Sequence, residues 1–518
     1  MADLPVRFEE RMKELLGDEY QDFAASYDRE RVQGLRLNGL KTEQDEAWEI
    51  TGAPALADYI RRETGFGLEK IPWVKEGYYY GGNDRPGRHP FHEAGLYYIQ
   101  EPSAMAVAEL LDPRPGERVL DLCAAPGGKS SHIASRLKGR GFLLSNEIHP
   151  ARAKILSQNM ERMGVRNAVV SNEDSAHLAR IFHGFFHKIV VDAPCSGEGM
   201  FRKDQEARTQ WSEEHVRMCA ARQGEILDNA ASMLAPGGRM VYSTCTFAPE
   251  ENEGTVLDFL KRHPEFRTEQ VKACPGFTEG QPRWAGFGRE EEEPEREPER
   301  EPGEKPLDEY HLEYTFRIMP HKLEGEGHFM AVLRKAGGGE ANGEASNGEK
   351  AQGEKAKGGA LSRNPMYLDA GKRKEVFRDF EPFIRNTMTE PDRFLDRMEY
   401  VLFGDQLYLL PPDMPDMKGI KILRPGLHMG TLKKNRFEPS HALALALRKD
   451  QVKLSRELPP GEDGSSRYLK GETLILEDRG GEEEPKGWVL VCTGGFSLGW
   501  AKCAGGMLKN HYPKGLRQ

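Results

Sequence analysis

Two cysteines, Cys195 and Cys245, each follow a short apolar run that is typical of a buried β-strand. Cys195 lies in Asp192-Ala-Pro-Cys-Ser-Gly-Glu-Gly, directly after Ile189-Val-Val, and Cys245 ends the run Val241-Tyr-Ser-Thr. Because catalytic groups in open α/β sheets sit at the carboxyl ends of strands, both thiols are expected at that edge. A cysteine can act as a covalent nucleophile, and the second cysteine then needs a separate role. Position alone favours Cys195 as the nucleophile.

A third cysteine, Cys123, begins a glycine-containing turn between an expected strand at 118–122 and an expected helix at 130–137. The turn contains Cys123, Ala124, Ala125, Pro126, Gly127, Gly128 and Lys129. A strand, a glycine turn and a helix in this order allow a backbone to approach a nucleotide-like ligand. The turn matches neither a full G-x-G-x-x-G pattern nor a Walker loop. We interpret Cys123 as backbone lining of this turn.

Carboxylates follow the next two expected strands. Glu147 comes after the strand at 141–145, and Asp174 comes just after the strand at 168–171. An acid about twenty residues past the glycine turn is placed to accept hydrogen bonds from ribose hydroxyls. Each acid alone could be a solvated loop residue. Together with the glycine turn they predict a nucleotide-like cofactor.

Other polar residues near these motifs leave alternatives open. Arg202 and Lys203 are either phosphate contacts or part of a solvated turn. His132, His149 and His177 are interpreted as surface or capping groups. Since no His, Asp and Glu set has metal-ligand spacing in the sequence, no metal is predicted.

The elements that position these motifs alternate between strand and helix. Further helices are expected at 150–163 and 213–234, and a further strand at 239–244, with Ser103 as the cap of a helix over 104–111. This alternation predicts an α/β fold with a doubly wound, mostly parallel sheet. Two closing strands are expected around 314–319 and 328–333. Towards the C-terminus, a hairpin over 400–410 and apolar runs at 487–492 and 496–500 indicate a small β-barrel.

The 518 residues carry a net charge of −10, which argues against a nucleic-acid binder when taken alone. However, the run from Arg289 to Lys305 holds nine Glu against four Lys and Arg, so half of that charge lies in one solvated stretch. The segment 336–359 is rich in Gly, Ala, Glu and Lys and predicts a flexible linker.

The chain contains no apolar run near the ~18 residues of a membrane span, and its first residues do not resemble a signal peptide. The seven cysteines form no Cys-x-x-Cys pair, so reduced thiols and a cytoplasmic location are expected. The other four, Cys219, Cys274, Cys492 and Cys503, are interpreted as small buried hydrophobic residues.

The motifs at 123–129, 192–199 and 242–246 resemble those of the NOL1/NOP2/Sun family of S-adenosylmethionine-dependent RNA cytosine-C5 methyltransferases. The stretches 95–105 and 249–253 are similar to further motifs of that family. The region after 360 resembles, more loosely, the C-terminal extension of bacterial 16S ribosomal RNA methyltransferases of the RsmF type, including a PUA-like RNA-binding barrel.

The resemblance implies a role for each motif residue. Cys245 would be the nucleophile that adds to C6 of cytosine, and Cys195 would assist release of the methylated RNA. Asp192 would lie between the base and the cofactor, and Lys129 would help to orient the base. S-adenosyl-L-methionine would be held by the turn residues Cys123, Ala124, Ala125, Pro126, Gly127, Gly128 and Lys129, by Glu147 at the ribose, by Asp174 at the adenine amine, and by Asp192.

The same resemblance implies the architecture and the partners. We expect a Rossmann-like class I methyltransferase domain with a seven-stranded sheet at 91–335, with an acidic insert at about 286–306. An N-terminal RNA-binding α/β domain at 1–90 precedes it, and the linker at 336–359, a C-terminal α/β module at 360–435 and a PUA-like domain at 436–518 follow. A monomer is expected, with RNA, most simply 16S rRNA either naked or in the small subunit, as substrate. A tRNA methyltransferase and a non-catalytic RNA-binding assembly factor are the alternatives.

Overall fold

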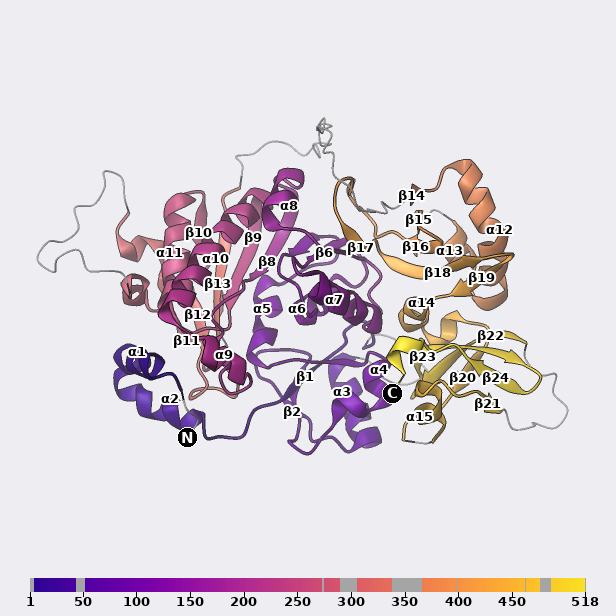
Figure 1. Cartoon of the computed structure of the whole chain (residues 1–518), viewed down its shortest axis with the longest axis horizontal. Helices are drawn as coiled ribbons and strands as arrows, with labels where there is room; N and C mark the ends of the chain where they lie inside the picture. The colour runs from indigo at the N-terminus through magenta and orange to yellow at the C-terminus, as the bar shows by residue number, and fades with distance from the viewer. Residues whose placement is uncertain are drawn as a thin grey trace, which may run out of the picture.

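The computed structural model describes residues 4–42, 52–272, 274–288, 305–337, 366–396, 398–461, 463–475 and 486–517. The acidic run, apart from Lys305, and most of the expected linker lie outside the described residues. The domain limits expected from the sequence stay predictions. Figure 1 shows a central sheet covered by helices, with the C-terminal part of the chain, from residue 366 onward, beside it.

The central sheet has the order β11-β12-β13-β9-β8-β5-β6-β7-β17, with β10 paired to β13. Strands β9, β8, β5, β6 and β7 are parallel neighbours, and β13 is antiparallel to β9. The predicted doubly wound, mostly parallel sheet is therefore confirmed, although three short strands extend it to ten. The bounds are β5 Arg118–Asp121, β6 Phe142–Asn146, β7 Ala168–Ser171, β8 Phe186–Asp192, β9 Leu234–Thr244, β10 Phe266–Thr268, β11 Thr278–Glu279, β12 Phe316–Ile318, β13 His328–Lys335 and β17 Ile422–Arg424.

Alternate residues of the core strands enter two separate hydrophobic cores, one on each face of the sheet. Leu120, Leu144 and Ile189 lie in one core, whereas Val119 and Val190 lie in the other. Burial on both faces explains why these strands read as continuous apolar runs. The covering helices are α5 Ala106–Leu111, α6 Gly128–Leu137, α7 Pro150–Arg162, α8 Ser175–Ile181, α9 Gln205–Gln210, α10 Glu213–Met233 and α11 Glu253–Arg262.

The start of α5 differs from the prediction. Ser103 does not cap a helix, because residues Ser103–Met105 form a 3-10 turn and α5 begins at Ala106. Glu101 takes the capping role instead, since its carboxylate accepts hydrogen bonds from the backbone N–H groups of Ser103 and Ala104 at 3.0 and 2.8 Å.

The N-terminal residues form two units that pack on different neighbours. Phe8 of α1 lies 5.0 Å from Phe201, ring centroid to centroid, so the first two helices cover the loop after Cys195. A small sheet of order β2-β3-β1-β4 instead shares a hydrophobic core with the C-terminal strands, and Tyr512 donates to Glu93 at 3.1 Å. The bounds are α1 Val6–Leu16, α2 Tyr20–Ser26, β1 Gly34–Leu37, α3 Gly52–Thr64, β2 Glu69–Lys70, β3 Gly77–Tyr79, α4 Pro90–Glu93 and β4 Tyr97–Ile99.

The C-terminal residues form two five-stranded sheets, β14-β15-β16-β18-β19 and β20-β22-β23-β24-β21, with α14 between them (Figure 1). The predicted hairpin and the predicted strands at 487–492 and 496–500 are confirmed. The bounds are β14 Met366–Tyr367, α12 Ala370–Thr387, α13 Asp392–Leu395, β15 Tyr400–Phe403, β16 Gln406–Leu409, β18 Leu427–Lys433, β19 Arg436–Pro439, α14 His441–Ala446, β20 Ser455–Glu457, α15 Asp463–Leu469, β21 Leu474–Ile475, β22 Gly487–Thr493, β23 Phe496–Ala504 and β24 Met507–Asn510.

No helix among the described residues is both long enough and apolar enough to cross a membrane.

Candidate active site

The two cysteines meet at the carboxyl edge of the central sheet. Cys195 lies just after β8 and Cys245 just after β9, and their Sγ atoms are 3.3 Å apart. Both side chains are partly buried. The hydrogen bond to Cys245, together with burial, raises the pKa of the Cys195 thiol. Cys195 is therefore suited to remain protonated and to donate a hydrogen bond to the sulfur of Cys245.

A network of buried hydrogen bonds holds the two cysteine loops against each other. The hydroxyls of Ser196 and Thr246 lie 2.8 Å apart, and Gly199 N–H donates to the carbonyl of Cys245 at 2.9 Å. A Cβ at Gly199 would lie 2.9 Å from that carbonyl oxygen, so glycine is needed for this close approach. The distance between the thiols is thus fixed by the loops that carry them.

Glu251 holds the Cys195 loop through a hydrogen bond to Ser196, and it was not identified from the sequence. Its Oε2 accepts from Ser196 N–H at 3.0 Å and from Gln223 Nε2 at 2.8 Å, while its Oε1 has no described partner. Burial raises the pKa of this carboxyl to about 8. A protonated Glu251 can therefore hold the loop at neutral pH without adding a negative charge beside the thiols.

Asp192, the last residue of β8, is held by three groups on one side of the cysteines. Lys129 Nζ lies 2.6 Å from its Oδ2, Ser243 Oγ donates to Oδ1 at 2.8 Å, and His328 Nε2 is 3.6 Å from Oδ1. Burial opposes ionisation, but the positive charge of Lys129 and the interaction with His328 outweigh it and lower the pKa of Asp192. His328 begins β13, and its distance from Asp192 in the sequence gave no signal of this contact.

The glycine turn connects β5 to α6 and is fixed by side chains of α7. Arg152 donates to the carbonyl of Ala125 at 2.9 Å, and Asn159 donates to that of Pro126 at 2.8 Å. Gly127 has a left-handed backbone with φ of 114°, which glycine tolerates and which lets α6 begin at Gly128. Cys123 is partly buried here, and burial raises the pKa of its thiol, which fits a lining role.

The expected cofactor acids follow successive strands at the same edge. Glu147 is buried after β6, where it accepts from His149 N–H at 2.9 Å and lies 3.4 Å from Arg152. Asp174 is exposed after β7 and caps α8 by accepting from His177 N–H at 2.7 Å. Below the turn, Asp121 is buried with one oxygen unpartnered, and burial raises its pKa to about 7. This unpartnered acceptor and the row of carboxylates fit a ligand that carries an amino group and ribose hydroxyls.

Two interpretations from the sequence are wrong. Arg202 is neither a phosphate contact nor part of a solvated turn, because its buried guanidinium pairs with Glu326 at 2.8 Å and donates to the carbonyl of Ser26. His132 is not a surface group either. It is buried with Nε2 3.2 Å from Glu109, beside Glu76.

His132, Glu76 and Glu109 together place three potential metal-ligand atoms within 4.8 Å, a grouping that the sequence spacing did not indicate. Arg136 pairs with both carboxylates, at 3.2 Å to Glu76, so an internal cation already offsets one of the two negative charges and occupies their oxygen atoms. We assign no metal to it.

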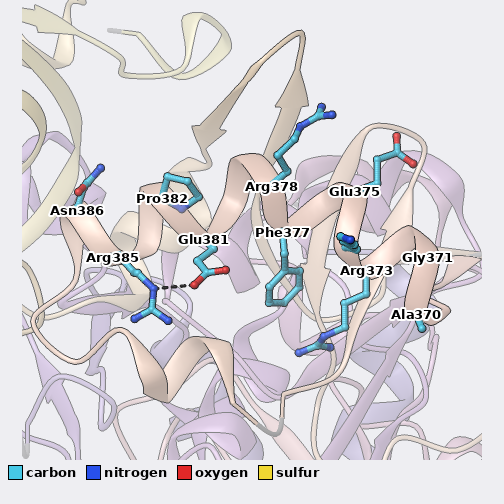
Figure 2. Close-up of a pocket in the computed structure, with 11 residues that line it drawn as sticks. Ala370, Gly371, Arg373, Glu375, Phe377, Arg378, Glu381, Pro382, Arg385 and Asn386 are labelled. Atoms are coloured by element: carbon cyan, nitrogen blue, oxygen red, sulfur yellow. Dashed lines mark hydrogen bonds and ion pairs between the residues drawn. The ribbon is translucent and has the colours of Figure 1, made fainter.

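A hollow of about 1170 Å³ lies away from the motifs. It follows one helix, α12, where Arg385 pairs with Glu381 at 2.7 Å (Figure 2). Its lining includes no motif residue, so the strand-end cluster remains the candidate active site.

Four family models match successive parts of the chain. They are 16S rRNA methyltransferase RsmB/F at 108–334, the N-terminal domain of 16S rRNA methyltransferase RsmF at 4–102, the RsmF rRNA methyltransferase first C-terminal domain at 382–447, and the methyltransferase RsmF PUA domain at 455–518.

Individual proteins are similar over the same regions. The ribosomal RNA small subunit methyltransferase F of Erwinia tasmaniensis is 29% identical over 99% of this chain and 96% of its own length. That of Escherichia fergusonii is 36% identical over 50% of this chain and 54% of its own length. A crystal structure of a methyltransferase homolog protein from Pyrococcus horikoshii is 26% identical with a TM-score of 0.52, covering 64% of this chain and 96% of that one.

Proposed function

The chain belongs to the RsmF family of S-adenosylmethionine-dependent 16S rRNA methyltransferases, and from this premise we propose that it methylates C5 of a cytosine in 16S rRNA. The observation that carries the proposal is the pair of thiols 3.3 Å apart at the ends of β8 and β9, beside the Lys129–Asp192 ion pair. A methyltransferase acting on an amino group or a hydroxyl needs no such pair.

Cytosine C5 is a weak nucleophile, and covalent catalysis overcomes this. In the proposed reaction, the Cys245 thiolate forms a bond to C6, and the displaced electron pair makes C5 nucleophilic. S-adenosylmethionine supplies the electrophilic methyl group. Methyl transfer breaks the methyl–sulfur bond of the cofactor and leaves the thioether S-adenosylhomocysteine. C5 then loses its proton to water, the C5–C6 double bond re-forms, and the Cys245 thiolate leaves.

The neighbouring residues have separate roles in this proposal. Cys195 stays protonated, donates a hydrogen bond to the Cys245 thiolate in the free enzyme and assists release of the product. Asp192 faces the base and the cofactor together, and Lys129 keeps it ionised. Glu147 and Asp174 accept hydrogen bonds from the ribose and the adenine amine, and the 123–129 turn lines the remaining part of the cofactor. A target base within folded RNA has to be flipped out or single-stranded to reach the two thiols.

Methyl transfer to 16S rRNA and trapping of a covalent RNA adduct, measured in paired variants, test the assignment. Cys245→Ala should abolish both methyl transfer and the adduct, whereas Cys195→Ala should accumulate a protein–RNA adduct that survives denaturing electrophoresis. Cys219→Ala, which alters a buried cysteine of α10, is the matched control and should keep activity. Activity that survives in Cys245→Ala would sink the mechanism.

The opposite pattern, with an adduct in Cys245→Ala and none in Cys195→Ala, would exchange the two roles. Bisulfite sequencing of total RNA from a deletion strain distinguishes a ribosomal target from a tRNA target. Calorimetry with S-adenosylmethionine separates an enzyme from a non-catalytic assembly factor, which would bind no cofactor.

A further inference from the structure

A second pocket, of about 340 Å³, lies where the central sheet, the N-terminal sheet region and the C-terminal module meet. Arg140 comes just before β6 and Arg166 just before β7, so this pocket is at the amino edge of the sheet, opposite the cysteines. Its described lining is Leu40, Lys41, Lys138, Gly139, Arg140, Met163, Gly164, Arg166, Asn167, Arg393, Leu445, Ala446, Arg448 and Gln451.

The lining contains six cations and, among the described residues, no carboxylate. Three helices, α6, α7 and α14, end at this pocket, and each carboxyl end carries about half a negative charge. Two of the six cations have acidic partners outside the lining, since Arg393 is 3.8 Å from Glu390 and Arg448 is 2.8 Å from Asp450. Of the other cations, Lys41, Arg140 and Arg166 have no carboxylate partner among the described residues. The helix ends balance about one and a half of these three positive charges, which leaves the pocket positive.

Lys41 and Arg166 form the floor of the pocket. Lys41 is buried and donates to the carbonyl of Leu445 at 2.7 Å, and Arg166 donates to the next carbonyl, that of Ala446. Neither has a carboxylate partner among the described residues. Burial and the neighbouring positive charges lower the pKa of Lys41 to about 8 and that of Arg166 to about 10. A bound anion would relieve this unfavourable concentration of positive charge.

The helix ends meet closely enough to define the shape of the pocket. A Cβ at Gly164 would lie 2.6 Å from the carbonyl oxygen of Leu445, and Gly164 has a φ of 69°, so no side chain fills this junction. Arg140 is exposed at the rim, and its guanidinium has no described carboxylate partner. The pocket thus combines buried cations with an accessible arginine.

We propose that this pocket binds a phosphate group of the RNA substrate, at a point remote from the methylated base. The inference rests on the proposed function, because it assigns the RNA backbone as the ligand. Such a contact carries no base information and instead fixes the register of the RNA on the protein. Since the lining comes from three parts of the chain, the pocket is complete only when these parts are docked together.

RNA binding as a function of salt concentration tests the inference on the full-length protein. Arg140→Glu and Arg166→Gln should weaken binding of a 16S rRNA fragment by about tenfold at 100 mM KCl and reduce the salt slope by about one. The loss should appear in KM for RNA, with kcat at saturating RNA and the affinity for S-adenosylmethionine retained. The control is Arg180→Glu, which changes an exposed arginine of α8 outside the pocket. It should change neither the RNA affinity nor the salt slope.

Unchanged RNA affinity and salt slope in both pocket variants, with wild-type methylation intact, would overturn the inference and leave the proposed function standing. A wild-type protein that methylates no rRNA would instead remove the proposed function. Inorganic phosphate provides a third arm. If it raises the melting temperature of the wild type but not of Arg166→Gln while RNA binding is equal in both, the ligand is a free anion and the RNA assignment fails.

Discussion

Lys129 Nζ lies 2.6 Å from Asp192 Oδ2 and so joins the start of α6 to the end of β8. Both side chains are largely shielded from solvent, which strengthens the attraction between their charges. The pKa of Lys129 is raised because the charge of Asp192 outweighs the cost of burial. The pair therefore presents an ionised carboxylate between the glycine turn and the two cysteines.

We expect Asp192→Asn and Lys129→Met each to lower methyl transfer by about a hundredfold or more, because each leaves the other charge unpaired at the reacting end of the site. The double variant should lose less than the product of the two single effects, since the residues act as a pair. Single-turnover methyl transfer measures this coupling. Lys433→Met, which breaks the exposed pair with Asp405, should have no effect, and strictly multiplicative losses would contradict the pairing.

The short distance between the sulfur atoms of Cys195 and Cys245 predicts that the two residues can be oxidised to a disulfide. Treatment with hydrogen peroxide should form a disulfide between them, with the two thiols losing their protons and two electrons to the peroxide, which becomes water. Peptide mapping should locate the bond, and dithiothreitol should restore activity. Cys195→Ala should form no such bond, and a cross-link to Cys123 instead would contradict the geometry.

The strands of the central sheet were predictable because their sequence signal is local. Ala168–Ser171 is bounded as expected, since a strand buried on both faces is a continuous apolar run between polar ends. Strand β17 was not predictable in this way. Its pairing with β7 brings Ile422 opposite Ser171, and nothing in either segment specifies a partner so far away in the chain.

The site residues also differ in whether their sequence signal is local. Cys195, Cys245 and Asp192 were found from strand ends, and the turn at 123–129 from its glycines. His328 and Glu251 were not found, because each acts through a contact formed only in the folded sheet. Arg202 was misread for a related reason, since an arginine in a polar loop gives no sign of its buried partner Glu326.

The buried carboxyl of Glu251 predicts a pH-dependent stability. Burial raises its pKa to about 8 from an ordinary value of 4.5, so between these values the folded protein holds a proton that the unfolded chain has released. Stability should therefore fall as pH rises from about 5 to about 8, by on the order of 4 kcal/mol from this group.

Glu251→Gln should remove that dependence while keeping the bond to Ser196. Urea unfolding at pH 5, 6.5 and 8 measures the free energy of unfolding. The value for the variant should increase relative to that of the wild type as pH rises. Glu279→Gln, at an exposed position of β11, is the control and should follow the wild type. Parallel pH profiles for Glu251→Gln and wild type would show that this carboxyl is ionised throughout the range.

Among the described residues, the most deeply buried ion pair joins Arg317 of β12 to Glu253 at the start of α11, with side-chain exposures of 1% and 0%. Arg317 also donates to the carbonyl of Phe247 at 3.0 Å, and Phe247 follows Cys245 by two residues. Arg317→Met leaves the Glu253 charge buried and unpaired, so it should lower the free energy of unfolding by about 3–5 kcal/mol. The double change Arg317→Met/Glu253→Met should recover part of that loss, because it removes both charges.

Arg436→Met, which breaks an exposed pair with Glu438, is the control. It should lower the free energy of unfolding, measured by urea titration, by less than about 1 kcal/mol. Equal costs for Arg317→Met and Arg436→Met would mean that water reaches the Arg317 site and that the pair does not hold the Cys245 loop.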